Sequence, residues 1–194
     1  MPDPVAMTAA PEDAPRLISS LVTAFAADPF IRWMFPDAEQ YLRSFPLVLT
    51  HFAGGAFDHG SAFRTADYRA AALWLPPGVA PDEAALGAVM EEGVAPDLQA
   101  EVFGVLEEVG AGHPDEAHWY LPAMGADPTC QRKGYGSAVM AESLRRCDEG
   151  HIAAYLESTN PANIPFYQRF GFDVVGDIQS GSSPVVTRML RAAR

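Results

Sequence analysis

A glycine-containing turn between a predicted strand and a predicted helix constrains this chain more than any other feature. Residues 118–126 are predicted to form a strand, and residues 134–149 carry apolar side chains at helical spacing. The turn between them holds the segment Gln131-Arg132-Lys133-Gly134-Tyr135-Gly136. A helix that begins directly after such a turn presents free backbone N–H groups and the positive end of its dipole, which bind phosphate groups. We therefore expect an anion-binding site at this turn.

The charge distribution supports an anion site here although the chain is acidic. Its 194 residues carry a formal charge of −12, which argues against nucleic acid or an anionic membrane surface as a partner. However, 18 of the 25 acidic residues precede His118, and the only lysine, Lys133, lies in the turn beside Arg132. The acidic residues of segment 82–116 are most simply a solvated helical face, and attraction of a cationic amine is the alternative.

Three kinds of phosphate-binding loop can be compared with the turn. A Walker A loop places its lysine after the glycines, whereas Lys133 precedes them. A dinucleotide fingerprint requires a third glycine, and Val139 stands in its place. The third pattern is Q/R-x-x-G-x-G/A, which Gln131, Gly134 and Gly136 match completely.

The remaining pattern predicts a single α/β or α+β domain with a sheet of six or seven strands. Residues 1–10 are expected to be a frayed lead-in or an edge strand. The expected helices are 12–27, 37–52 with a kink at Pro46, two within 81–112, 134–149, and 163–170 capped by Asn163; the expected strands are 62–68, 70–75, 118–126, 152–156, 174–178 and 185–190.

Cellular location and metal content follow from small features of the sequence. The first residues lack the basic and apolar regions of a signal peptide, and no apolar run approaches the length of a membrane span. Cys130 and Cys147 form neither a disulfide framework nor a zinc-ligand spacing. We therefore expect a cytoplasmic protein with free thiols and no metal.

Several motifs together resemble the GNAT superfamily of N-acetyltransferases and, within it, the puromycin N-acetyltransferases. They are the Q-x-x-G-x-G turn, the segment His118–Pro128, the segment Tyr155-Leu156-Glu157-Ser158-Thr159-Asn160, and the segment from Asn163 to Phe172 that contains N-I-P-F-Y and G-F. The resemblance implies a GNAT fold, with a mixed, mostly antiparallel sheet whose splayed central strands are flanked by helices. It is strongest from 118 to 187, which implies that 118–194 bind acetyl-CoA and that 1–117 shape the acceptor pocket.

The resemblance also implies roles for individual residues. Tyr167 is expected to donate a proton to the leaving thiolate, and Glu157 to act as the base, with His118 in reserve. Asn160 and Asn163 are expected to bound the thioester end of acetyl-CoA. Its remaining contacts are expected from Met124, Gly125, Ala126, Gln131, Arg132, Lys133, Gly134, Tyr135, Gly136 and Ser137. The acceptor is expected to be a small primary amine that attacks the acetyl group directly in a ternary complex, and the candidate acceptor-binding aromatics are Phe30, Trp33 and Trp119.

Other interpretations stay open at this point. Tyr167 could be an ordinary core aromatic, and Glu157 an exposed or capped carboxylate. The chain could be a catalytically silent acyl-CoA-binding module, a nucleotide-binding module of Rossmann type, or an acetyltransferase for protein N-termini or lysines. A homodimer is also compatible with the resemblance.

Overall fold

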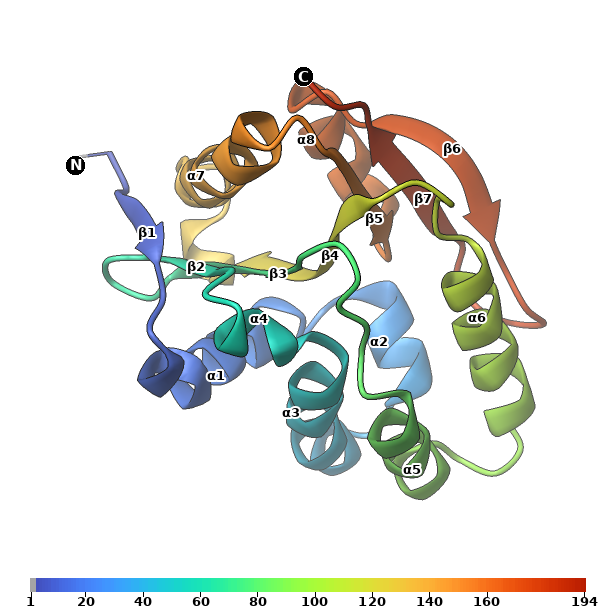
Figure 1. Cartoon of the computed structure of the whole chain (residues 1–194). Coiled ribbons are helices and arrows are strands. Elements are labelled where there is room, and N and C mark those ends of the chain that lie inside the picture. The colour runs from blue at the N-terminus through green and yellow to red at the C-terminus, as the bar shows by residue number, and fades with distance from the viewer. Residues whose placement is uncertain (1–2) are drawn as a thin grey trace.

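A seven-stranded sheet forms the centre of the computed structural model, which describes residues 3–194 (Figure 1). Its strand order is β1-β2-β3-β4-β5-β7-β6, and every neighbouring pair is antiparallel except β4 with β5. The strands are β1 (Ala6–Thr8), β2 (Ala62–Thr65), β3 (Ala70–Leu75), β4 (His118–Ala126), β5 (Ala153–Ser158), β6 (Asp173–Ile178) and β7 (Val186–Arg191). The predicted mixed, mostly antiparallel sheet flanked by helices is confirmed.

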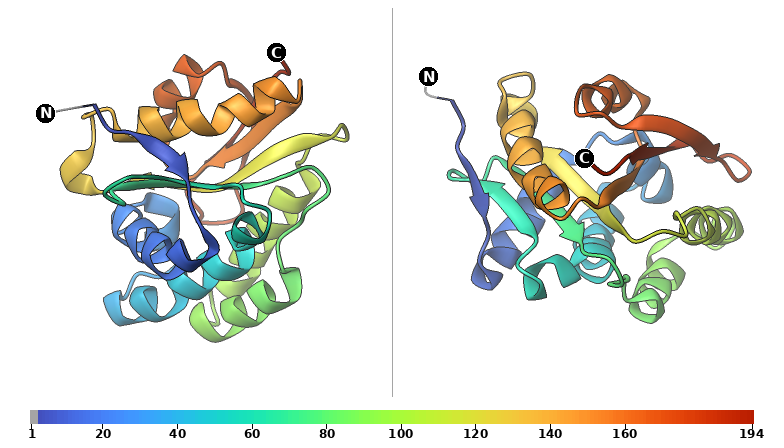
Figure 2. Two further views of the ribbon diagram at one scale, coloured as in Figure 1. Left: turned by 60° about the vertical axis from the view of Figure 1, so that its left-hand side comes forward. Right: turned by 45° about the horizontal axis from the view of Figure 1, so that its top comes forward.

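Helices cover both faces of this sheet (Figures 1 and 2). On one face lie α7 (Tyr135–Glu149) and α8 (Ile164–Arg169), while the helices of the N-terminal half lie on the other. Those are α1 (Ala14–Ala24), α2 (Pro29–Met34), α3 (Ala38–Ala53), α4 (Gly55–Asp58), α5 (Glu83–Gly93) and α6 (Gln99–Ala111), with α6 beside β6. Single 3₁₀ turns occupy Pro11–Asp13, Pro128–Cys130 and Pro161–Asn163. Across residues 3–194, no helix is long and apolar enough to cross a membrane.

Besides a small cluster of Leu75, Tyr120 and Tyr155, the described residues form two hydrophobic cores, which the sheet separates. The larger core contains Leu17, Phe45 and Val105 from the N-terminal helices, and the smaller one contains Val139 and Leu144 of α7. All six residues of β3 are buried because this strand is covered on both faces. A strand in that position is apolar throughout, which explains why its bounds could be predicted from the sequence.

The first predicted helix is shorter than expected because Asp28 begins a helix instead of ending one. The helix α1 ends at Ala24, and the Asp28 carboxylate accepts hydrogen bonds from the amides of Phe30 and Ile31 at 3.0 and 3.1 Å. An aspartate followed by proline is an N-cap and first-turn pair, so the same two residues open the short helix α2. The predicted bounds of the helix over 12–27 are therefore wrong, and the helix α2 that follows it was not predicted.

A similar correction applies to the cap of α8. Asn163 occupies the N-cap position without a side-chain capping bond. Instead, Asn160 caps the preceding 3₁₀ turn through a 3.0 Å bond from the amide of Ala162. The turn at Pro161 therefore moves the capping function three residues upstream, close to the end of β5.

Candidate active site

The two central strands separate after a short parallel contact. β4 and β5 pair only from His118 opposite Ala153 to Tyr120 opposite Tyr155, although both strands continue further. The divergence begins where β4 contains one residue more than β3 does. Tyr120 lies opposite Leu75 and Ala123 lies opposite Leu73, so two residues of β4 stand between these pairs but only one of β3. This β-bulge contains Pro122, which has no N–H to donate to a ladder. The expected splayed central strands are thus observed, and the edge of β4 that faces β5 is unpaired beyond Tyr120.

The turn before α7 has the geometry of an anion site. Gly134 has a φ of +85°, and Arg132 has a φ of +58°, so two residues of this turn have a left-handed backbone conformation. The amides in the first turn of any helix have no intrahelical partner, and no side chain caps those of α7. The ammonium group of Lys133 donates a 2.7 Å hydrogen bond to the carbonyl of Thr129 within the same turn. Alternating positive-φ residues aim successive N–H groups toward one point, as in phosphate-binding nests.

The end of β4 lies against this turn and against α8. A Cβ atom on Gly136 would lie 3.6 Å from Cε of Met124 and 3.7 Å from the ring of Phe166. Gly125 has a packing role, because a Cβ atom there would lie 2.6 Å from the Cβ of Ala24 in α1. The structure therefore brings the predicted cofactor residues of β4 and of the turn to one place, between α7 and the splayed strands.

Glu157 lies on β5 with its carboxylate inside the molecule. Its side chain is 6% exposed, and its Oε1 atom has no hydrogen-bond partner among the described residues. Burial raises the pKa of Glu157 to about 7, while the hydroxyls of Tyr120 and Tyr155 and the charge of Arg188 act in the opposite direction. A carboxyl group with a pKa near neutrality is suited to accept and release a proton at physiological pH.

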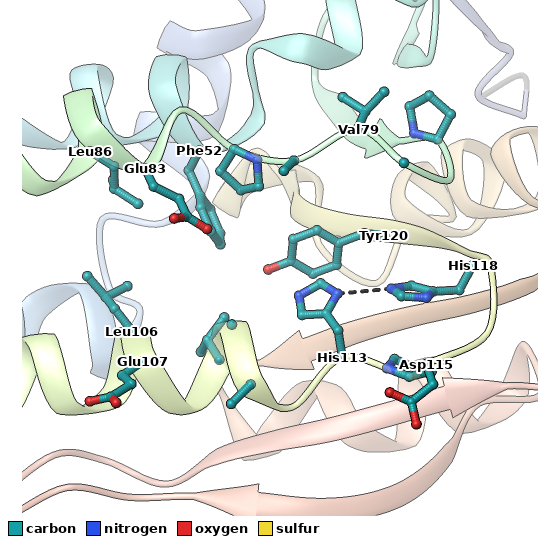
Figure 3. A pocket seen from close by; sticks show the side chains of 18 of the residues that line it. Phe52, Val79, Glu83, Leu86, Leu106, Glu107, His113, Asp115, His118 and Tyr120 are labelled. Carbon is teal, nitrogen blue, oxygen red and sulfur yellow. Dashed lines mark hydrogen bonds between the residues drawn. The ribbon is translucent and has the colours of Figure 1, made fainter.

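His113 is a neighbour of Glu157 that sequence reasoning missed. It lies between α6 and β4, and its Nε2 atom is 3.9 Å from Oε1 of Glu157. Its ring packs edge-on against Tyr120, with the centroids 4.5 Å apart, and its Nδ1 atom is 2.9 Å from Nε2 of His118 (Figure 3). Burial and the nearby His118 lower the pKa of His113 to about 4. No motif surrounds His113, so only the three-dimensional structure identifies it.

An open cavity of about 850 Å³ lies beside these histidines (Figure 3). The hydroxyl of Tyr120 points into it, and acidic side chains stand around it. The acidic residues that line it are Glu83, Glu107, Asp115 and Glu116, and none of the lining residues is a lysine or an arginine. The acidic segment 82–116 is therefore partly a cavity wall as well as a solvated face.

A smaller, apolar cavity of about 80 Å³ adjoins the open one and reaches Glu157 and Thr159. The two cavities share the side chains of five residues: Phe52, Leu86, Leu106, Val109 and Tyr120. Acidic side chains therefore line the open cavity, and Glu157 is the carboxylate that lines the adjoining apolar one.

The three aromatic residues predicted to bind the acceptor lie in different places in the structure. Phe30 is buried and lines the inner cavity, whereas Trp33 packs against Phe30 and donates a hydrogen bond to Ser182. Trp119 faces the core beneath α7, because side chains alternate along β4 and Tyr120 faces the cavities. The structure does not bring Trp119 to the cavities.

Tyr167 lies on α8 and is buried in the smaller core, beside Phe172. Burial, together with the nearby Asp28, raises the pKa of its hydroxyl well above the usual range. Asn160 and Asn163 lie at the two ends of the 3₁₀ turn that joins β5 to α8. The cavity residues and Tyr167 thus approach the divergence of β4 and β5 from opposite faces of the sheet.

Comparison with known proteins defines the class of the molecule. A model of the acetyltransferase (GNAT) family matches residues 57–172, more than half of the chain. The chain belongs to this family and is accordingly an acyltransferase. The region matched includes β4, the turn before α7, Glu157 and Tyr167.

Individual relatives are distant. An uncharacterized N-acetyltransferase of Schizosaccharomyces pombe is 23% identical over 182 residues, which cover 83% of this chain and 71% of the yeast protein. A crystal structure from Corynebacterium glutamicum, described as histone acetyltransferase HPA2 and related acetyltransferase, is 25% identical with a TM-score of 0.69, covering 100% of this chain and 98% of that one. The polyamine N-acetyltransferase of Drosophila melanogaster has the same fold, with a TM-score of 0.67, 15% identity and coverage of 98% and 100%.

Proposed function

We propose that this protein transfers the acetyl group of acetyl-CoA to a primary amine of a small molecule by direct attack in a ternary complex. The observation that carries the proposal is the pair of adjoining cavities, here called the acceptor chamber: acidic side chains line its open part, the mouth, and Glu157 lines its apolar part. The fold family uses acetyl-CoA, and the residues present here fit that ligand. The uncapped first turn of α7 suits its phosphates, and the unpaired edge of β4 suits the amide groups of its pantetheine arm.

In this proposal, the two halves of the chain hold the two substrates. Residues 118–194 bind acetyl-CoA through the turn before α7, the end of β4 and the asparagines that flank the turn after β5. Residues 1–117 supply most of the walls of the acceptor chamber. The acidic mouth and the absence of lining lysine and arginine favour a cationic acceptor over an anionic one. The neighbours that act on polyamines support an amine acceptor by analogy of fold alone.

Glu157 is the proposed base, because a buried carboxylate with a pKa near 7 can take a proton from an ammonium group at neutral pH. Tyr167 is the proposed partner of the leaving thiolate. Its raised pKa makes complete proton transfer to sulfur unfavourable, so its hydroxyl contributes mainly as a hydrogen-bond donor. Holding the amine and the thioester in reacting geometry is expected to be the larger effect.

Direct attack is favoured over an acyl-enzyme because neither cysteine is available as a nucleophile. Cys130 is 3% exposed and Cys147 is 1% exposed. Burial also raises the pKa of the Cys147 thiol to about 12, so it carries almost no thiolate at neutral pH.

A panel of amines tests the proposal. Purified protein is incubated with acetyl-CoA and with puromycin, spermidine, an arylalkylamine or a lysine-containing peptide, and free thiol is followed with time. The proposal expects thiol release with at least one small amine and a product that is heavier by one acetyl group. CoA binding without transfer to any amine would identify a silent CoA-binding module. Transfer to the peptide alone would identify a protein acetyltransferase.

A further inference from the structure

We propose that His113 and His118 form a relay that carries the proton accepted by Glu157 out to the mouth of the open cavity. The proposal rests on the proposed function, since it concerns the proton that amine acetylation releases. It assigns a role to His113 that no motif in the sequence indicates. His118 becomes the outer member of the relay and not an alternative base.

The stoichiometry of the reaction requires such an exit. An ammonium group carries three hydrogens, and the amide product retains one. The new C–N bond forms while the C–S bond breaks, and the thiolate takes one of the two remaining protons. The other proton must reach solvent in every turnover. Glu157 receives it at a position where only 6% of its side chain is exposed, so a path from the carboxylate is needed.

The hydrogen bonds of the two histidines define the direction in which a proton can move between them. The Nδ1 atom of His118 lies 2.8 Å from the carbonyl oxygen of Glu116, which only accepts, so this nitrogen carries the hydrogen. In the neutral ring, Nε2 of His118 then carries no hydrogen (it is bare), and it accepts a hydrogen bond from Nδ1 of His113, 2.9 Å away. Nε2 of the neutral His113 is consequently also bare, and it faces Oε1 of Glu157. Both bare nitrogens therefore lie on the side that faces the buried carboxylate.

A proton on Glu157 can thus move outward once without any ring turning, and both rings must then turn to restore the starting arrangement of hydrogens before the next turnover. The proton passes to Nε2 of His113 while the Nδ1 hydrogen of His113 passes to His118. His118 then carries hydrogen on both ring nitrogens, and it can give its Nδ1 hydrogen to water in the open cavity that it lines. The separation of 3.9 Å between Glu157 and His113 is bridged by a small approach or by one water molecule. Because burial keeps His113 neutral, the ring holds the extra proton only in passing.

The other groups around Glu157 cannot supply this route. Tyr120 of β4 and Tyr155 of β5 have pKa values raised well above their usual range, so neither releases a proton near neutrality. Arg188 of β7 lies opposite Glu157 in the sheet, and a guanidinium group has no acceptor atom that could receive a proton. Of the described residues that face Glu157 from β4, β5, β7 and the loop before β4, only His113 is both near the carboxylate and hydrogen-bonded to a second imidazole ring.

The test compares His113→Gln and His118→Gln with the control His59→Gln, whose side chain is exposed and bonds only within its own turn. We expect kcat at pH 7 to fall about 10- to 100-fold in both relay variants, with the KM for acetyl-CoA unchanged. Added imidazole, a diffusible proton carrier, is expected to restore most of the lost kcat in His113→Gln and to leave the control unchanged. A folded His113→Gln protein with wild-type kcat, or with a loss that imidazole does not relieve, would overturn the relay.

A second measurement does not depend on activity. Nitrogen-15 spectra of the histidine side chains in the wild-type protein report which ring nitrogen carries the hydrogen. The relay predicts hydrogen on Nδ1 of both His113 and His118 near pH 7, and hydrogen on Nε2 of either ring contradicts it. Absence of acetyl transfer by the wild-type protein would refute the proposed function. These spectra would still decide whether the hydrogens of the two rings are placed as the relay requires.

Discussion

Thr159 donates a 2.7 Å hydrogen bond to Oδ2 of Asp28, which lies 131 positions earlier in the chain. The other oxygen of Asp28 holds the first amides of α2, so one buried carboxylate joins this helix to the segment that follows β5. Burial raises the pKa of Asp28 although these bonds favour its charged form. The contact fixes an N-terminal helix beside the strand that carries Glu157, and it lies near Tyr167.

Removal of the Thr159 hydroxyl is expected to destabilise the protein. Thr159→Val leaves a buried carboxylate with one donor fewer, which costs about 1–3 kcal/mol in unfolding free energy. The control is Thr23→Val, because Thr23 is exposed and bonds only to the carbonyl of Ser19 in its own helix. Urea unfolding of both variants measures the difference. Equal midpoints for the two variants would mean that the link between Thr159 and Asp28 does not contribute to stability.

The raised pKa of Glu157 predicts a dependence of stability on pH. The folded chain keeps a proton on Glu157 that the unfolded chain loses between its ordinary pKa of 4.5 and about 7. Deprotonation therefore favours unfolding in this range, and the shift corresponds to about 3 kcal/mol lost as pH rises. Glu157→Gln removes the titration, so its stability relative to wild type should be higher at pH 8 than at pH 5. A difference between the two proteins that stays constant with pH would contradict the buried, uncharged carboxyl.

Tyr167→Phe is expected to lower kcat more than it alters KM. A hydrogen bond to a charged thiolate is worth about 1.5–3 kcal/mol, so the expected loss is about 10- to 100-fold. Because the pKa of Tyr167 is raised, the wild-type rate should show no decline as pH rises from 7 to 9. Steady-state kinetics over this range measure both effects, and unchanged turnover in the variant would remove Tyr167 from the reaction.

Gly134 is expected to be essential for the anion-binding turn. Its φ of +85° strains any other residue, and Gly134→Ala should rotate the amides that precede α7. Gly60→Ala is the matched control, because Gly60 also has a positive φ and open space around it. Both variants should lose about 1 kcal/mol of stability. Only Gly134→Ala should weaken CoA binding, by about 10- to 100-fold as measured calorimetrically. Equal CoA affinity in the two variants would contradict the assignment of the turn.

Local features could be predicted from the sequence. The bounds of β3 and β4 are as predicted, since Ala70 to Leu75 is a short apolar run that Pro76 ends, and β4 stops at the Asp127-Pro128 pair. The helix predicted over 134–149 is present as α7, which begins one residue later because Gly134 is its N-cap, with a positive φ. Each of these signals arises within a few residues, where backbone geometry and side-chain type are directly coupled.

Features that depend on contacts between distant segments could not be predicted. His113 meets Glu157 only because β4 and β5 pair in one particular register, with Tyr120 opposite Tyr155. The face of β4 to which Trp119 belongs was also undetermined, since residues 118–124 are largely apolar on both faces. An Asp-Pro pair such as Asp28-Pro29 can follow the end of one helix or begin the next. Only the packing of α2 shows that this pair begins a helix.

Two-substrate kinetics test the central claim most directly. Initial rates of thiol release are measured with acetyl-CoA and a reactive amine, each at several concentrations, for wild type and Glu157→Gln. The account predicts intersecting double-reciprocal lines, as for direct attack in a ternary complex, and a loss of about 100-fold or more in kcat/KM for the variant. Parallel lines, or thiol release that does not depend on any amine, would contradict acetyl transfer to an amine at Glu157.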